Sequence, residues 1–145
     1  MTDIDAVIDV SADIEQWRPS ATRVELPRTR VGRIRKFNLQ SFKGYIVVNC
    51  LNGYPVEVFI HVGKEGGALH GLLIVVAKLV SLSLKHGVPA SDVAASLRGE
   101  AFEPSGFGHL GDGKTRQFDS IASLIADALD GSGAGGSAGD IADGG

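Results

Sequence analysis

The sequence has very little of what disulfides, metal centres or membrane spans require. Cys50 is the only cysteine, which excludes an internal disulfide and any zinc or iron–sulfur site built from several cysteines. The longest apolar run, 72–80, is interrupted by Lys78 and is far shorter than the ~20 residues of a membrane span. The acidic N-terminus lacks the basic and apolar regions of a secretory signal. We therefore expect a cytoplasmic protein without membrane contact.

The overall composition is typical of one soluble globular domain, with 43% hydrophobic and 21% charged residues among 145. The net charge of −3 gives no reason to expect double-stranded nucleic acid or an anionic membrane as a partner. Positive charge is nevertheless concentrated, because eight of the 14 basic residues lie between Arg18 and Lys43, where Glu25 is the only acid. This basic segment is a candidate surface for an anion or an acidic partner.

The chain divides into three parts. Residues 1–24 form an acidic N-terminal segment, in which Ile4, Val7, Ile8 and Ile14 have the spacing of a short helix that packs on the body. Residues 25–130 form the folded domain. Residues 131–145 are almost entirely Gly, Ala, Ser and Asp, which bury too little apolar surface to offset the entropy of ordering them. A flexible tail is expected there.

Three β-rich runs, 31–39, 44–51 and 56–62, predict an antiparallel sheet. Asn52-Gly53 separates the second run from the third and is a strong signal for a two-residue hairpin turn. In the third run, alternation separates an apolar face from a mixed one. The apolar face carries Val56, Val58, Ile60 and Val62, and the mixed face carries Glu57, Phe59 and His61. We expect the apolar face to meet the helices and the mixed face to be partly open.

The rest of the domain predicts three helices. The first runs from Gly67 to about His86, and Gly87 with Pro89 ends it. Its polar residues share one stripe, so this helix is expected to be largely buried; they are His70, Lys78, Ser81 and Lys85. A shorter helix follows at about 89–97, then a glycine-rich loop at 102–115 without periodicity. An amphipathic helix covers about 116–129, and its apolar stripe consists of Ile121, Leu124, Ile125 and Leu129.

Together these elements predict the fold class. It is α+β, a small antiparallel sheet covered on one face by a long buried helix and two shorter helices.

The link between the third strand and the long helix is a candidate anion site. It contains His61, Lys64, Gly66 and Gly67, and the start of a helix offers unpaired N–H groups and a favourable dipole to a phosphate. The pattern is neither the Walker loop nor the dinucleotide fingerprint. As a motif alone, it is better explained as a tight strand-to-helix turn with a solvated lysine.

The basic start of the first strand is a second candidate. It carries Arg30, Arg33, Arg35 and Lys36. Alternation places Arg33 and Arg35 on the same side of the strand, as a fork suited to phosphate. Charged side chains are also a common protection of edge strands against aggregation. The residues leave both interpretations open, and in either case we expect the two arginines to be exposed.

Catalytic and metal chemistry have little support in the remaining residues. The four histidines lack the helical spacing of a metal site, and Cys50 alternates with Ile46 and Val48 as a buried structural thiol does. Ser105 has neither a nucleophile elbow nor a nearby base. We therefore assign no catalytic residue, no metal and no cofactor to this chain.

One pattern extends across most of the domain, from about Leu26 to Leu129, and resembles a known family. The sequence is similar to the TSCPD domain, found near the C-terminus of adenosylcobalamin-dependent (class II) ribonucleotide reductases. The matching stretches are Leu26-Pro27, Thr29-Arg30, Lys36-Phe37, Gly44-Tyr45, Asn52-Gly53-Tyr54-Pro55, Glu57, Phe59-Ile60, Lys64-Glu65-Gly66, Gly71-Leu72, Ser81-Leu82, Gly87-Val88-Pro89 and Phe102-Glu103-Pro104-Ser105-Gly106.

The chain also departs from what this resemblance implies. A class II reductase carries a radical-forming cysteine, a redox cysteine pair, a large barrel and a cobalamin site, and a chain with Cys50 alone cannot supply these. Cobalamin therefore belongs to the full-length relatives. The final helix carries Ala126, Asp127 and Ala128 where aromatic residues are expected, so the contacts of that helix with partners in a full enzyme are not expected here.

Three functions remain open from the sequence. The first is a non-catalytic accessory or regulatory protein that binds a nucleotide effector or a ribonucleotide reductase subunit. The second is an oligomeric nucleotide-sequestering protein, bacterial or phage-encoded, since an apolar helix and an open sheet face in a small domain are typical of homo-oligomers. The third is a pure protein-interaction module.

Overall fold

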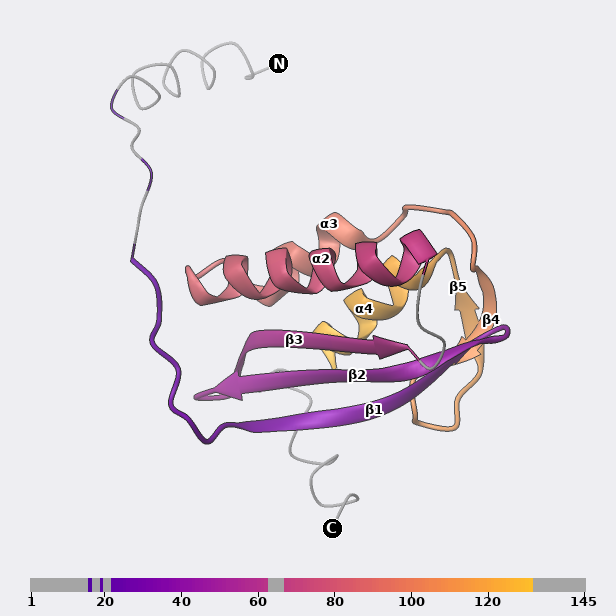
Figure 1. The fold of residues 1–145 in the computed structure, drawn as a ribbon, viewed down its shortest axis with the longest axis horizontal. Coiled ribbons are helices and arrows are strands. Elements are labelled where there is room, and N and C mark those ends of the chain that lie inside the picture. Colours follow the sequence, from indigo (N-terminus) through magenta and orange to yellow (C-terminus); the bar gives the residue numbers. More distant parts are fainter. Residues whose placement is uncertain (1–15, 17–18, 20–21, 63–66, 132–145) are drawn as a thin grey trace, which may run out of the picture.

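Residues 16, 19, 22–62 and 67–131 are described by the computed structural model. The sheet contains β1 (Val31–Leu39), β2 (Phe42–Leu51), β3 (Tyr54–Val62), β4 (Gly106–His109) and β5 (Arg116–Phe118), and the helices are α2 (Gly67–Lys85), α3 (Ala90–Leu97) and α4 (Ile121–Asp130). Figure 1 shows the helices together on one side of the sheet. This is the α+β arrangement predicted from the sequence. The predicted N-terminal helix and C-terminal tail lie outside the described residues.

The sheet is antiparallel throughout, in the order β3-β2-β1-β4-β5. The hairpin predicted at Asn52-Gly53 is confirmed. Leu51 pairs with Tyr54, and the two turn residues have φ values of 54° and 83°. Positive φ at both positions matches the right-handed twist of the strands, and Asn followed by Gly tolerates it best. The turn therefore sets the pairing of the residues next to it, and a register shift between Asn49 and Cys50 moves the rest of β2 by one residue against β3.

Two strands lie where the sequence predicted a loop and the start of a helix. β4 falls within 102–115, and β5 occupies the first residues assigned to the last helix. Both are too short to show an alternating pattern, and two of the four residues of β4 are glycines. A Cβ on Gly108 would lie 2.2 Å from the Asn38 carbonyl oxygen, so the close approach of β4 to β1 requires glycine there. The glycines that let β4 approach β1 also remove the side-chain pattern by which a strand could be predicted.

The helix ends follow from local sequence signals. Gly87 has a φ of 92°, its N–H donates to Leu84 O, and Val88 N–H donates to Ser83 O. This pair of bonds is the Schellman arrangement that ends a helix at glycine, as predicted for α2. α4 begins five residues later than predicted, where Ser120 Oγ accepts a hydrogen bond of 3.1 Å from Ala122 N–H.

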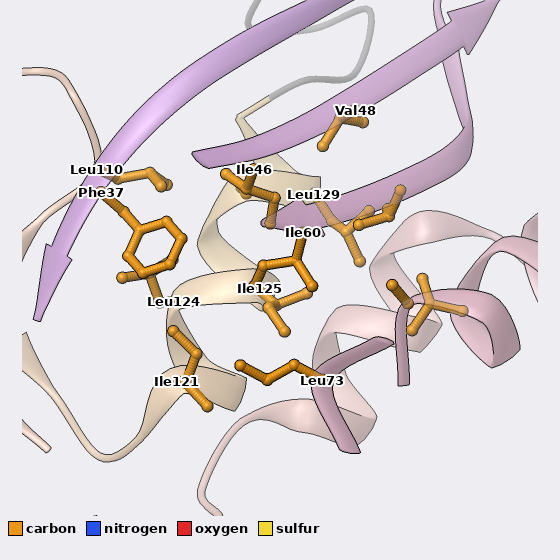
Figure 2. Packing of buried hydrophobic residues seen from close by; sticks show 14 of the residues in the cluster. Phe37, Ile46, Val48, Ile60, Leu73, Leu110, Ile121, Leu124, Ile125 and Leu129 are labelled. Atoms are coloured by element: carbon orange, nitrogen blue, oxygen red, sulfur yellow. The ribbon is translucent and has the colours of Figure 1, made fainter. Parts of the chain in front are cut away.

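The core lies between the sheet and α4, with α2 on β3 and α3 against α4 (Figure 2). The apolar stripe predicted for the last helix is confirmed, since its four members are at most 1% exposed; they are Ile121, Leu124, Ile125 and Leu129. Ala126 and Ala128 are fully buried as well. Their small side chains let α4 sit deep in the domain, surrounded on nearly all sides.

The prediction that α2 is largely buried was wrong. Five of its large apolar side chains are between 38% and 59% exposed, namely Leu72, Ile74, Val75, Leu79 and Leu82. Ser81, predicted on the polar stripe, is instead buried beneath the helix, where its Oγ accepts from Val58 N–H at 2.8 Å and donates to Val58 O at 3.1 Å. The periodicity identified the helix, but α2 has apolar residues on two faces and the sheet covers only one.

The strand order bears on the edge-strand interpretation of the first strand. β1 lies between β2 and β4, although β4 pairs only with Asn38 and Leu39. β3 is an edge strand of the sheet. Ser81 of α2 forms hydrogen bonds with the backbone of Val58 in β3. Arg33 and Arg35 thus lie in the part of β1 that pairs with β2 alone among the described strands, and protection of an edge stays an open interpretation for them.

Candidate functional site

The side of the sheet away from the helices carries six side chains of which five are exposed and Val47 is half-buried. We call it the open sheet face, defined by Ile34, Lys36, Tyr45, Val47, Phe59 and His61. Strand pairing arranges these residues in two rows across β1, β2 and β3: one is Ile34, Val47 and Phe59, and the other is Lys36, Tyr45 and His61. Ile34 is 70% exposed, Phe59 52% and Tyr45 42%. The mixed face predicted for the third strand is thus confirmed as partly open.

A third row on this side of the sheet contains a carboxylate, Glu57, whose charge is balanced by a nearby arginine. Glu57 is only 8% exposed, pairs with Asn49 in the strand register and accepts a 2.9 Å hydrogen bond from Asn49 Nδ2. Arg30 Nε lies 3.3 Å from the same carboxylate oxygen. Arg30, one of the predicted ligand-binding residues, therefore balances a nearly buried carboxylate at the margin of the open sheet face.

The arginine fork predicted from alternation does form, but on the helix side of the sheet. Arg33 Nη1 and Arg35 Nη2 both donate to the carbonyl oxygen of Gly131, at 3.3 and 3.2 Å. Gly131 ends α4, and cations are favourable at the carbonyl end of a helix dipole. Both arginines are half-buried, so the expectation that they are exposed was wrong. Their described partner is the end of a helix.

Replacing Arg33 and Arg35 together by alanine is therefore expected to destabilise the domain. Hydrogen bonds from charged groups contribute about 1.5–3 kcal/mol each when buried, and half-exposure reduces this, so we expect a loss of about 2 kcal/mol for the pair. Lys36→Ala, on the opposite face of the same strand, is the matched control and should leave stability within about 0.5 kcal/mol. Urea denaturation followed by circular dichroism measures both. Equal stability of the double variant and the control would contradict a structural role.

A groove lies beside this fork, and acidic and basic side chains form a series of ion pairs along it. Asp127 binds Arg98 at 2.6 Å and Arg116 at 3.2 Å, Arg98 also pairs with Asp130, and Arg116 reaches Asp112 at 3.1 Å. Burial acts to raise the pKa of the Asp112 carboxyl, but the Lys114 backbone N–H and the Arg116 guanidinium outweigh it and hold that pKa below its usual range. These ion pairs engage Arg116 and the three carboxylates that line the groove, while Lys36 and Lys114 line it as well, so the groove is of mixed charge and not a purely cationic phosphate site.

The remaining predicted site residues are not brought together with the fork. Lys36 and His61 lie in one row of the open sheet face, and the His61 ring centroid is 6.2 Å from that of Tyr45. Gly67 begins α2 with a φ of 81°. Lys64 and Gly66 lie outside the described residues. The six described residues of this prediction thus divide between the two faces of the sheet and the start of α2.

Cys50 stands at the end of β2 and is half-buried. Burial raises the pKa of its thiol, and the nearby Arg33 opposes that rise. A raised pKa leaves little of the nucleophilic thiolate at neutral pH. Among the described residues, no group of three or more His, Cys, Asp or Glu side chains is placed to hold a metal ion.

A second exposed surface, on α2, was not predicted from the sequence. We call it the α2 stripe and define it by Leu72, Val75, Leu79 and Leu82, whose spacing places them along one side of the helix. Within the described residues α2 is long and apolar enough to cross a membrane, with a mean hydropathy of 1.9 over 18 residues of which 28% are buried. Beside the stripe, a cavity of about 540 Å³ lies between α2 and the edge of β3, and Ile74, Lys78 and Phe59 are among its lining residues.

Sequence alternation could have found part of the open sheet face. In β2, Tyr45 and Val47 alternate with the buried Ile46 and Val48. Their pairing with His61 and Phe59 was not predictable, because the register shift between Asn49 and Cys50 moves the strands by one residue from the register of the turn. The α2 stripe gave no such signal, because its residues are as apolar as those that α2 buries.

Comparison with known proteins identifies the family of the domain. The model of the TSCPD domain family matches residues 15–131. A vitamin B12-dependent ribonucleotide reductase of Rhodopirellula baltica is 30% identical over 105 residues, which are 72% of this chain and 10% of that protein. Reductases of the same name from Streptantibioticus cattleyicolor and Streptomyces coelicolor are 30% and 29% identical, over 83% of this chain and 20% and 12% of theirs.

No solved structure matches the chain significantly. The chain spans between a tenth and a fifth of the length of these three reductases. Because the family model covers most of the sequence, including every described strand and helix, this chain belongs to the TSCPD domain family.

Proposed function

We propose that this chain is a non-catalytic accessory protein of ribonucleotide reduction, which docks on a reductase subunit through the α2 stripe. The observation that carries the proposal is that its relatives are vitamin B12-dependent ribonucleotide reductases in which the matching region is a small part of a much longer protein. In those proteins the matching region is joined to a much longer chain. The same fold here leaves apolar surface exposed, and a complementary subunit could cover it.

The α2 stripe has the form of a helix docking site. Its four apolar residues recur at helical spacing on an accessible surface, which is how an amphipathic helix presents itself to a partner groove. Contiguous exposed apolar patches mark interaction surfaces in soluble proteins. Lys78 and Lys85 line the adjoining cavity, so a partner with acidic residues beside its apolar groove would fit best.

The absence of catalysis in this chain is part of the proposal. The resemblance implies that a reductase of this type needs a radical-forming cysteine and a redox cysteine pair. Cys50 is the only thiol, and its raised pKa and half-buried position fit a structural role. The reaction would be carried out by the partner, and this chain would affect its assembly or regulation.

The expected result of Leu79→Glu is the loss of docking. Leu79 lies in the centre of the stripe and is 58% exposed, so a carboxylate there should leave folding intact but should weaken binding at least about 30-fold, the effect of losing an interface hot spot. Surface plasmon resonance on an immobilised vitamin B12-dependent ribonucleotide reductase measures the affinity. Val31→Glu, a 78% exposed apolar residue far along the chain on β1, is the matched control. No binding by the unaltered chain, or equal binding by both variants, would contradict the proposal.

Nucleotide binding on the open sheet face is a second candidate, favoured by one observation. Lys36, Tyr45 and His61 lie in a single accessible row, where a ring and a cation could hold a base and a phosphate. A nucleotide effector bound there would make the accessory role regulatory, whereas a chain that forms a stable oligomer and retains nucleotide after purification would be a sequestering protein. Light scattering and mass spectrometry of the purified chain distinguish the two.

A further inference from the structure

The open sheet face combines exposed rings with positive charge and lacks a free carboxylate. Its described aromatic members are Tyr45, Phe59 and His61, and the exposed ring of Phe107 continues the same side on β4, since Phe107 alternates with the buried Gly108. Glu57 is the only acid that the strand register places on this side. It is neutralised by Arg30 and Asn49, so an anion would meet no repulsion from it.

Lysines stand beside the rings in the register. Lys36 is opposite Tyr45, and Lys43 is opposite Asn38 at the next row toward β4. Both lysines are exposed. Lysine is depleted from protein–protein interfaces, whereas it is the ordinary partner of phosphate in nucleic-acid surfaces. The mixture of lysines and rings therefore favours a polyanion with flat groups over a protein partner.

The spacing of the rings suits more than one base. Tyr45 pairs with His61, and Phe59 pairs with Val47 two residues along β2, so Tyr45 and Phe59 are diagonal neighbours on adjacent strands. Diagonal neighbours are about 7–8 Å apart, which allows each ring to stack on its own base. A single mononucleotide would use one ring and leave the others exposed.

We propose that the open sheet face binds single-stranded nucleic acid, with consecutive bases stacked on Tyr45 and Phe59 and phosphates held by Lys36 and Lys43. Exposed aromatic side chains on a sheet are the general means by which proteins stack unpaired bases, and a cationic surround follows the backbone. Bases that are paired in a duplex present no free faces to such rings. This function goes beyond reductase docking, which would use α2 and the cavity beside it. Phe59 lines that cavity as well, but Tyr45, Lys36 and Lys43 do not, and neither function depends on the other.

Fluorescence anisotropy with a fluorescein-labelled 12-nucleotide oligothymidylate tests the inference on the full chain. At low salt we expect saturable binding, no comparable binding of a 12-base-pair duplex, and at most weak competition by thymidine triphosphate. Tyr45→Ala and Phe59→Ala should each weaken binding about tenfold, as the loss of one stacked base does, while Tyr45→Phe keeps the ring and should keep the affinity. Lys36→Ala and Lys43→Ala should each lower the slope of log affinity against log salt by about 0.7.

The control variants test whether oligonucleotide binding depends on the open sheet face or only on the positive charge of the protein. Lys78→Ala removes an exposed lysine on α2, and Leu72→Ala removes an exposed apolar residue there; neither should change oligonucleotide binding. Circular dichroism of each variant confirms folding.

Equal affinity for duplex and single strand, or binding that survives loss of both rings, would overturn the inference. So would tight binding of thymidine triphosphate with none of the oligonucleotide, which would instead support the nucleotide candidate above. Loss of reductase docking in Leu79→Glu with unchanged oligonucleotide binding would show that the two surfaces are separate.

Discussion

Leu124→Ala is expected to lower the free energy of unfolding by about 3 kcal/mol, since large-to-small changes in a rigid core cost about 2–5 kcal/mol. Leu124 is fully buried near the middle of α4, among the core residues in Figure 2. Helix α4 lies within the domain with seven of its ten residues buried, so little room exists for the surroundings to collapse into the space left by the missing atoms. Most of that space should remain as a cavity.

Urea denaturation followed by circular dichroism measures the change in stability. The matched control is Leu72→Ala, which removes the same atoms from a leucine that is 59% exposed on α2 and should change stability by about 0.5 kcal/mol or less. A comparable loss in both variants would mean that α2 is covered in solution, and concentration dependence of the Leu72→Ala midpoint would then identify a second copy of the chain as the cover.

The contrast between these two leucines shows how far a sequence can predict a fold. Periodicity placed Leu72 and Leu124 correctly on helices, because backbone geometry alone sets which residues share a helix face. It could not distinguish their burial, since both lie in apolar surroundings in sequence and only tertiary packing decides which face the sheet covers. The prediction that Ser81 lies on a polar stripe was wrong for the same reason. A serine hydroxyl is expected to face solvent, but here the Val58 backbone provides two hydrogen-bond partners for it inside the domain.

The candidate site could be predicted from the sequence to about the same extent as the fold. Alternation correctly placed Arg33 and Arg35 on one side of β1, but their described acceptor, the carbonyl of Gly131, is almost a hundred residues away and no local pattern connects them. The hairpin turn, in contrast, is a local signal, and it set the pairing of Leu51 with Tyr54. The register shift between Asn49 and Cys50, which brings Tyr45 beside His61, was not predictable from that turn. Features that depend on neighbours in sequence were found, and those that depend on distant contacts required the structure.

Gly44→Ala is expected to be at least as damaging as the core truncation, with a loss of about 3 kcal/mol or more. A Cβ on Gly44 would lie 2.1 Å from the His61 carbonyl oxygen and 2.9 Å from Val62 Cα. Both are backbone atoms of the neighbouring strand, so no side chain can move aside and β2 must separate from β3 where Gly44 pairs with Val62. Overpacking that displaces backbone costs about 1–3 kcal/mol, occasionally more, and the strand pairing is lost in addition.

Gly71→Ala is the matched control for Gly44→Ala and should act in the opposite direction. Gly71 lies inside α2, where a Cβ would meet nothing within 4 Å, and alanine in a helix interior is more stable than glycine by about 0.5–1 kcal/mol. Thermal unfolding should therefore show a higher midpoint for Gly71→Ala and a much lower one for Gly44→Ala. Because Gly44 and Val62 adjoin Tyr45 and His61, the same separation should also disrupt that row of the open sheet face and abolish oligonucleotide binding at temperatures where the variant is still folded. Unchanged stability of Gly44→Ala would mean that the strands are not paired in this register.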